Sequence, residues 1–207
     1  HYQLAKLDVA SFQLEQSFIP SGFSQSNTIT LPTPDGGEMD FYIYEAPSME
    51  KPLADKYPQI KTYTGIAVND ARIISKIDFT LFGFHAMILD GDQTYFIDPY
   101  TNMNNEWYVV YYKSNFAKSI NQSMHCHVDE SDQISDLGTP IRIDHQAVPS
   151  NSSYKTSGDT IRTYRLALAC TEEYSTAVGG STPTKASVLS AMVTSMNRCN
   201  GVFEKEF

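Results

Sequence analysis

The side chains best suited to chemistry in this sequence stand in a row at His125-Cys126-His127. All three can bind a metal ion, and in a strand the two histidines would lie on one face and the cysteine on the other. A zinc ion needs three or four ligands that converge on one point. The remaining histidines and cysteines are scattered along the chain, so the cluster does not predict a zinc site built by this chain alone.

The zinc-binding helix motif of metalloproteases, His-Glu-x-x-His, is absent. That motif presents two imidazoles one turn apart and uses the glutamate as a general base. None of the five histidines is followed by glutamate. These histidines are His1, His85, His125, His127 and His145. We therefore predict no catalytic residue and no bound metal in this chain.

No other catalytic or phosphate-binding motif can be assembled from the residues. The Gly36-Gly37 and Gly179-Gly180 pairs lack the strand–loop–helix spacing of a phosphate loop and indicate turns. His85 lies within an apolar run and is predicted to be a hydrogen-bonded core or inter-sheet histidine rather than a catalytic one. The pair Asp98-Pro99 is typical of a turn and predicts the end of a strand.

Composition limits the classes of partner. The chain has 207 residues, 41% hydrophobic residues and a net charge of −9, so it can form a sizeable core but is poorly suited to nucleic acid or an anionic membrane surface. An acidic surface also serves solubility. No apolar run approaches the roughly 18 residues of a membrane span, and no membrane partner is predicted.

The chain has three cysteines, an odd number that leaves at least one without an internal partner if the protein is exported. Cys126 stands alone in the first part of the chain. Cys170 and Cys199 follow on a predicted strand and a predicted helix. Two alternatives stay open for this pair, a disulfide or two buried free thiols that act as small hydrophobic residues.

The first part of the chain is predicted to be a β-meander. Thr28–Leu31 and Met39–Ala46 indicate a hairpin, and Pro47–Tyr57 has the apolar spacing of a short helix. Five strands are expected after it, with Asp90-Gly91 as a strong hairpin turn. Their ranges are Ile60–Val68, Ala71–Phe82, Phe84–Leu89, Thr94–Asp98 and Glu106–Tyr112. The strand Phe84–Leu89 is apolar on both faces, which predicts a central strand covered on both sides.

A polar stretch divides the chain. Asn151–Asp159 is rich in Ser, Thr and Gly, and it indicates an exposed linker between a domain over residues 1–157 and a second over residues 158–207.

The second part is predicted to consist of one strand and one long helix. Leu166–Cys170 is an apolar run typical of a buried strand. Thr182 and Pro183 predict the N-cap and first residue of a helix that continues to Glu204. Apolar residues recur on one face of this helix, which we expect to be the buried face. They are Val188, Leu189, Met192, Val193, Met196, Cys199 and Phe203.

Several segments resemble one protein family. Tyr164–Tyr174, Gly179-Gly180 and Asn197–Glu204 together resemble the start of the catalytic domain of bacterial secreted reprolysin-like zinc metalloproteases, which are metzincins. Upstream, Phe84–Met87 and Tyr95–Tyr100 resemble the prodomain of the same proteins. The likeness covers most of the chain from about Asp40 onward.

The resemblance implies an inactive zymogen fragment. It comprises an inhibitory, fold-assisting prodomain over residues 1–157 and an incomplete piece of the protease domain over residues 158–207. The implied partner is the rest of its own catalytic domain, and the implied cofactor is zinc in the parent enzyme. The fold class expected is α+β, a mostly antiparallel β-meander followed by a strand and long helix of a truncated α/β protease domain. Secretion is implied, and we expect that a leader has been removed before His1.

The family also suggests roles for individual residues. Cys126, as the one cysteine upstream of the linker, is the candidate inhibitory zinc ligand, because a thiolate in the fourth zinc position excludes the catalytic water. The Pro-Lys-Met-Cys-Gly-type sequence of animal relatives is absent around it, so a buried structural thiol is the alternative. Maturation cleavage is expected near Ser150, Lys155 and Gly158.

Two other functions are possible alternatives to the zymogen fragment. The chain could be an extracellular β-rich module that binds protein or glycan through exposed tyrosines at Tyr108, Tyr111 and Tyr112. A complete small hydrolase is the weakest hypothesis, since no nucleophile or metal motif is present. Finally, Arg162–Cys170 is expected to pair with a sheet edge of the prodomain or with the same segment of another copy, which would allow self-association.

Overall fold

The computed structural model describes residues 2–8, 19–91, 93–101, 104–116 and 165–206. Residues His1–Ala117 and Ala167–Phe207 form one compact unit. Lys118–Leu166 form a second unit, of which Arg165 and Leu166 are described. The predicted linker and the boundary between residues 157 and 158 lie outside the described residues.

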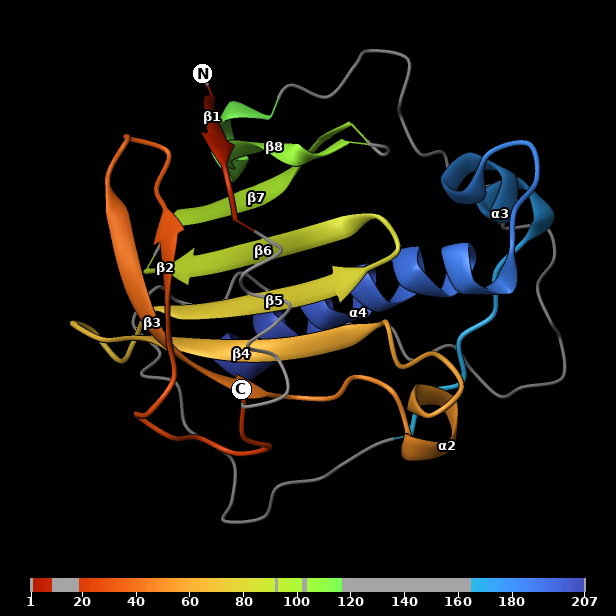
Figure 1. Ribbon diagram of the computed structural model, residues 1–207, viewed down its shortest axis with the longest axis horizontal. Coiled ribbons are helices and arrows are strands. Elements are labelled where there is room, and N and C mark those ends of the chain that lie inside the picture. The colour runs from red at the N-terminus through yellow and green to blue at the C-terminus, as the bar shows by residue number, and fades with distance from the viewer. Residues whose placement is uncertain (1, 9–18, 92, 102–103, 117–164, 207) are drawn as a thin grey trace, which may run out of the picture. The chain divides into compact units, whose positions relative to one another are not determined.

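One antiparallel sheet of eight strands organises the first unit, and Figure 1 shows it with the long helix α4 behind it. Its spatial order is β1-β8-β7-β6-β5-β4-β3-β2, so β2 to β8 each pair with the next strand in sequence and β1 returns to pair with β8. The strands are β1 (Gln3–Lys6), β2 (Thr28–Pro32), β3 (Glu38–Glu45), β4 (Lys61–Ala67), β5 (Ile74–Thr80), β6 (Gly83–Asp90), β7 (Gln93–Thr101) and β8 (Asn104–Tyr112). The predicted α+β class and antiparallel meander are confirmed.

Local turn chemistry accounts for the meander. The Asp90-Gly91 hairpin is confirmed, with Asp90 paired to Gln93 and Gly91 at a φ of 52°, a conformation that glycine adopts without steric cost. The hairpin of β2 and β3 is also confirmed. A short 3₁₀ helix, η2 (Lys113–Asn115), follows β8.

The turn predicted at Asp98-Pro99 is wrong. Both residues lie within β7, and the pairing of β7 with β8 is irregular at Pro99 and Thr101. A proline is tolerated at such an irregularity because its missing N–H is not needed by a regular ladder. The Asp98 side chain therefore points from a strand rather than from a loop.

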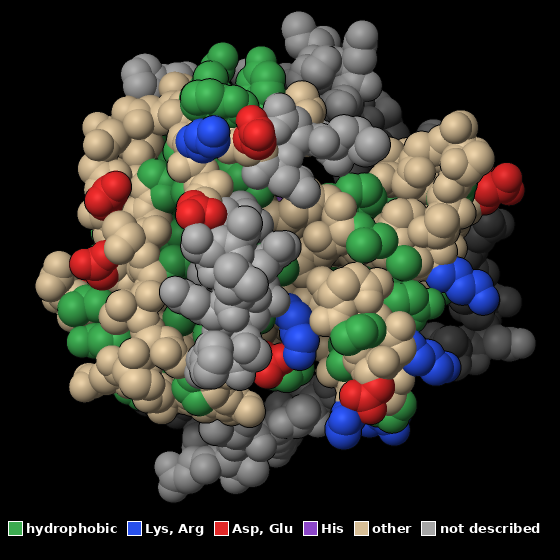
Figure 2. Space-filling model, viewed as in Figure 1, with side chains coloured by type: hydrophobic (Ala, Val, Ile, Leu, Met, Phe, Trp, Pro, Cys, Tyr) green, Lys and Arg blue, Asp and Glu red, His purple; other side chains and the backbone are tan. Residues whose placement is uncertain are grey.

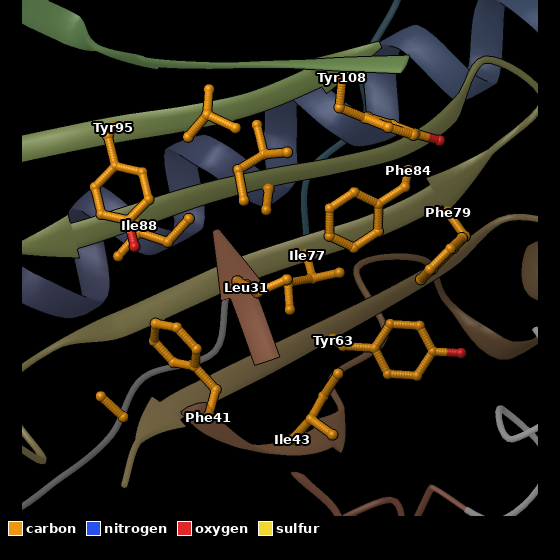
Figure 3. Close-up of a cluster of buried hydrophobic side chains, with 14 residues drawn as sticks. Leu31, Phe41, Ile43, Tyr63, Ile77, Phe79, Phe84, Ile88, Tyr95 and Tyr108 are labelled. Carbon is orange, nitrogen blue, oxygen red and sulfur yellow. The ribbon is translucent and has the colours of Figure 1, made fainter. Parts of the chain in front are cut away.

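One face of the sheet carries the hydrophobic core. Figure 3 shows these side chains on the face turned away from α4. Edge-to-face aromatic contacts run across the strands, with ring centroids 6.1 Å apart for Tyr63 and Phe79, 5.1 Å for Phe79 and Phe84 and 5.9 Å for Phe84 and Tyr108. The core consists of Leu31, Phe41, Ile43, Tyr63, Ala67, Ile77, Phe79, Phe84, Ala86, Ile88, Tyr95, Ile97, Tyr108 and Val110.

The central position predicted for the strand at residues 84–89 is confirmed. In β6, Phe84, Ala86 and Ile88 belong to the core, while Met87 and Leu89 are buried on the opposite face. On that opposite face α4 packs along β5 and also contacts β6.

Three α-helices accompany the sheet in the described ranges. The short helix predicted before Pro58 is present as α2 (Lys51–Ala54), with proline in its first turn. The sequence analysis missed α3 (Glu172–Gly179), although Thr171 caps it by accepting a hydrogen bond from the Tyr174 N–H and Glu172 and Glu173 occupy its first turn. The third helix is α4 (Lys185–Glu206). No helix among these described segments is long and apolar enough to cross a lipid bilayer.

The N-terminus of α4 lies two residues later than predicted. Thr184, not Thr182, caps it: the Ser187 N–H donates to Thr184 Oγ1 at 3.1 Å, and the Thr184 N–H donates to Ser187 Oγ at 3.0 Å. This reciprocal pair satisfies a donor that would otherwise lack a partner in the first turn.

The buried strand predicted at Leu166–Cys170 is wrong. Residues 165–170 are irregular and exposed, and they pair with no strand in the part of the chain described here. An apolar run becomes a strand only where a neighbour satisfies its backbone groups. Pairing with a second copy stays a prediction.

Candidate functional site

The candidate site is the contact between α4 and the sheet face opposite the hydrophobic core. We call this face the polar face. The stripe of α4 that faces the sheet contains Ser190, Val193, Asn197 and Gly201, all buried. Asn197 is 2% exposed and Ser190 is 0% exposed. Two of these four side chains are polar and one is glycine, so this helix packs mainly through small and hydrogen-bonding groups.

The buried face predicted for α4 is therefore largely wrong. The apolar stripe turns away from the centre of the contact, with Phe203 61% exposed and Cys199 exposed. Leu189, Met192 and Met196 are half-buried, whereas Val188 and Val193 are buried. The sheet contacts the polar stripe of α4 together with Val193. The rest of the apolar stripe lies beside this contact or away from it.

Asp78 is the centre of the contact. This carboxylate is 1% exposed and lies on β5 between the core residues Ile77 and Phe79, pointing to the opposite face. The Thr194 hydroxyl donates to Asp78 Oδ2 at 2.6 Å. Asn197 Nδ2 donates to the Ile77 carbonyl at 3.0 Å and lies 3.5 Å from Asp78 Oδ1. A buried carboxylate is tolerated because these donors replace water.

His85 completes this cluster. Its Nδ1 lies 3.3 Å from Asp78 Oδ2, from the neighbouring strand β6. His85 lies on the same face of β6 as Met87 and Leu89, opposite the hydrophobic core, and its side chain is 14% exposed. Thr194 donates to the aspartate and not to the imidazole, so the three side chains do not form a nucleophile and its base.

Lys76 forms a second contact two residues before Asp78. Its ammonium is 3% exposed, donates to Thr64 Oγ1 at 2.8 Å and lies 2.6 Å from Glu204 Oε2 near the end of α4. A Cβ atom added to Gly201 would lie 2.7 Å from Lys76 Cγ and 3.0 Å from Met87 Cε. Glycine at this position therefore lets α4 approach the sheet closely enough for the pair to form.

Asp98 forms a third contact on β7. Its carboxylate accepts from an Arg198 terminal nitrogen and, at 2.8 Å, from the Tyr111 hydroxyl. The Arg198 guanidinium also lies over the Phe96 ring, 4.9 Å from the centroid, an arrangement favoured by cation–π attraction. Burial raises the pKa of Tyr111, and the nearby Asp98 carboxylate raises it further.

An apolar groove borders the start of α4. It has a volume of about 490 Å³ and is lined by α2, by residues 168–170 and by the first turns of α4, including Leu53, Leu168 and Met192. Figure 2 shows hydrophobic side chains on the surface where α2 and α3 lie. The apolar stripe of α4 and this groove form one partly open surface.

The structure describes few of the residues named as candidates from sequence. Cys126, Ser150, Lys155 and Gly158, like His125 and His127, lie outside the described residues. Cys170 and Cys199 are both exposed free thiols. Neither alternative for this pair matches the structure, because the two are not bonded and are not buried.

The described residues do not fit a zinc ion. Within them, no three His, Cys, Asp or Glu side chains converge on one point.

The tyrosines named for a binding module do not form an exposed patch. Tyr108 is 0% exposed and belongs to the core. Tyr111 and Tyr112 point to opposite faces of β8, where their hydroxyls donate to Asp98 and Asp35 respectively.

Comparison with known proteins identifies no relative of this chain. No protein-family model matches the chain, and neither a curated protein nor a solved structure is significantly similar to it.

The sequence analysis missed the residues of the contact. Lys76 and Asp78 alternate with Ile77 and Phe79, a pattern that signals charged side chains on one face of a strand. On α4 the polar or small residues at 190, 194, 197, 201 and 204 recur at intervals of three and four. Either pattern marks a polar stripe, but neither alone indicates that the stripe is buried.

Proposed function

We propose that this chain is the N-terminal pro-region of a secreted zinc metalloendopeptidase zymogen, together with the first helices of its catalytic domain. In this role the pro-region inhibits the protease and assists its folding. Zinc belongs to the parent enzyme and not to this chain. The proposal starts from the family resemblance of residues 164–174 and 197–204 and is supported by how α4 is packed.

The observation that carries the proposal is the reversed packing of α4. A helix that belongs to a finished domain buries its apolar stripe. Here the stripe with Met192, Met196 and Phe203 is exposed or half-buried, while the stripe with Ser190 and Asn197 is buried. This arrangement fits a helix held by a pro-region on one side that keeps its apolar side for the catalytic domain.

The groove at the start of α4 supports the same assignment. Leu168 is 48% exposed and lies in an irregular segment beside the apolar stripe. A further strand laid on this groove could hydrogen-bond the exposed backbone of residues 165–170 and cover Leu189 and Met192. We expect that strand to come from the rest of the catalytic domain.

Inhibition is assigned to Cys126 as part of the proposal. A thiolate suits zinc and would displace the catalytic water. The residue lies in the segment that connects the sheet to α3, so it belongs to the pro-region side of the connection.

The test is expression of the reading frame continued past Phe207. We expect a His-Glu-x-x-His segment downstream, casein cleavage that a chelator abolishes, and activity that appears only after cleavage between the sheet and α3. Cys126→Ser should give premature activity, with Cys170→Ser as the matched control. A downstream sequence without the motif, or a precursor with no chelator-sensitive activity, would refute the proposal.

A binding module is the second candidate because of one exposed patch. Tyr2, Leu4 and Trp107 are 58%, 50% and 43% exposed. Leu4 and Trp107 lie on the paired strands β1 and β8, and Tyr2 directly precedes β1. Trp107 is the single tryptophan of the chain, so its fluorescence reports on this patch. A saturable change on adding a protein or glycan, lost in Leu4→Ser, would favour this function.

A further inference from the structure

We propose that the polar face of the sheet is a separable docking surface that recognises α4 by its side chains and does not need the covalent connection to it. The inference deepens the proposed function, on which it rests in naming α4 as part of the protease. The docking surface comprises Thr64, Lys76, Asp78, His85 and Asp98. Its ligand is a helix with a particular order of polar groups.

The order of these groups is set by the three contacts. Thr194 and Asn197 meet Asp78, Arg198 meets Asp98, and Glu204 meets Lys76. Gly201 lies between the last two and keeps the backbone of the helix close to the sheet. The partner must therefore present, in this order, a hydroxyl and an amide, a cation, a residue without a side chain and a carboxylate.

Burial makes this recognition selective. Asp78 and Lys76 are 1% and 3% exposed, and each has a partner on α4. A helix that lacks the matching groups would leave a buried charge unpaired, which is strongly unfavourable. Mismatched partners are thus rejected by the same residues that hold the correct one.

Docking through the polar stripe leaves part of the opposite stripe uncovered. Met192 and Met196 are half-buried while the contacts to the sheet are made. The surface can therefore hold α4 while an apolar partner assembles on its other side. This is how a pro-region could template a protease domain and later release it.

The experiment uses the full chain with the recognition sequence of a site-specific protease inserted after Gly158. After cleavage, the two fragments should stay associated in size-exclusion chromatography at about 50 mM salt. Their dissociation constant should rise at about 1 M salt, because the partly exposed pair of Arg198 and Asp98 is weakened by screening. The dissociation constant is then measured by sedimentation over a dilution series.

Charge variants test which groups carry recognition. Arg198→Glu should raise the dissociation constant at least about tenfold, because it places two carboxylates together. Combining it with Asp98→Arg should recover most of that loss. Ser195→Ala, an exposed position of α4, is the matched control and should leave the constant unchanged. Arg198→Lys keeps the charge but loses the planar fork and should lie between the control and Arg198→Glu.

Each outcome supports or contradicts the docking surface or its recognition by charge. Separation of the wild-type fragments at low salt would overturn the docking surface. Association that ignores salt and is equal in wild type and Arg198→Glu, or a double variant that is no better than the single one, would overturn recognition by charge. None of these measurements depends on protease activity. A reading frame without a zinc motif would therefore contradict the proposed function without contradicting the docking surface.

Discussion

On one face of the sheet Ile77 packs among aromatic rings, whereas on the other face its neighbours Lys76 and Asp78 are buried as charged groups beneath α4. The first face is stabilised by apolar burial, which is non-directional and scales with area. The second depends on a few hydrogen bonds and ion pairs with fixed partners. The same strand thus supplies fold stability on one side and recognition of a particular helix on the other.

The difference has a consequence for folding. Apolar surfaces tolerate changes of partner, while a buried charge without its partner is strongly unfavourable. We expect the sheet to form on the strength of its core and α4 to dock only in the register that satisfies Lys76, Asp78 and Asp98.

The largest effect is expected from removing core volume. Phe41 is 0% exposed, and Phe41→Ala should lower the free energy of unfolding by about 3–5 kcal/mol through lost burial and a cavity. Urea denaturation measures this loss. Phe23→Ala is the control, because Phe23 is 54% exposed and touches Tyr42 and Tyr44 by ring edges, and should cost about 1 kcal/mol or less. Equal losses from both variants would contradict the assigned core.

Removing the central carboxylate of the polar face comes next. Asp78→Ala should cost about 2 kcal/mol, because Thr194 and Asn197 each lose one buried acceptor and keep only the Ser190 and Ile77 carbonyls. Hydrogen exchange should show that α4 is loosened before the strands of the sheet. Asp40→Ala is the control, since Asp40 is exposed and accepts from Thr30. Uniform loosening of sheet and helix would mean that Asp78 supports the core rather than the docking of α4.

Alkaline pH should weaken the apolar face through two of its tyrosines. Burial raises the pKa of Tyr63 and of Tyr95 well above its usual value. The unfolded chain loses these protons near pH 10 while the folded chain keeps them, so their contribution is complete below about pH 10 and is lost as the pH rises further. Each group should cost about 1 kcal/mol per pH unit above that value.

Urea midpoints between about pH 9 and pH 11 measure this dependence on ionisation. Tyr95→Phe should flatten the decline by the share of one group, because Phe cannot ionise. An unchanged slope in this variant would indicate that Tyr95 is not the group that resists ionisation.

The smallest effect is expected at Gly201. Gly201→Ala should gain about 1 kcal/mol in helix propensity, yet its Cβ would meet Lys76 and Met87, so we expect a net loss of about 1 kcal/mol. Ser195→Ala changes propensity at an exposed position and should be neutral or slightly stabilising. Thermal unfolding compares the two variants, and a gain in both would show that α4 does not approach the sheet this closely.

Much of the sheet could be predicted because the signals are local. Asp90-Gly91 specifies a tight turn, and the apolar faces of residues 84–89 indicate a central strand. The misplaced elements lacked such a signal or depended on a neighbour. The sequence Asp98-Pro99 is typical of a turn, but pairing with β8 keeps both residues in a strand. The run Leu166–Cys170 is typical of a strand, but it pairs with none of the described strands.

What the sequence determined by itself was strands β2 to β8, most of the turns between them and the existence of the long helix, because alternation, turn residues and helical spacing act over a few neighbouring residues. Only the tertiary structure decided that the polar stripe of α4, and not its apolar stripe, lies on the sheet. That choice depends on Lys76, Asp78 and Asp98, which are 100 residues or more from their partners on the helix. Burial is a relation between two surfaces, so the pattern of one helix shows which face is apolar but cannot show which face meets the sheet.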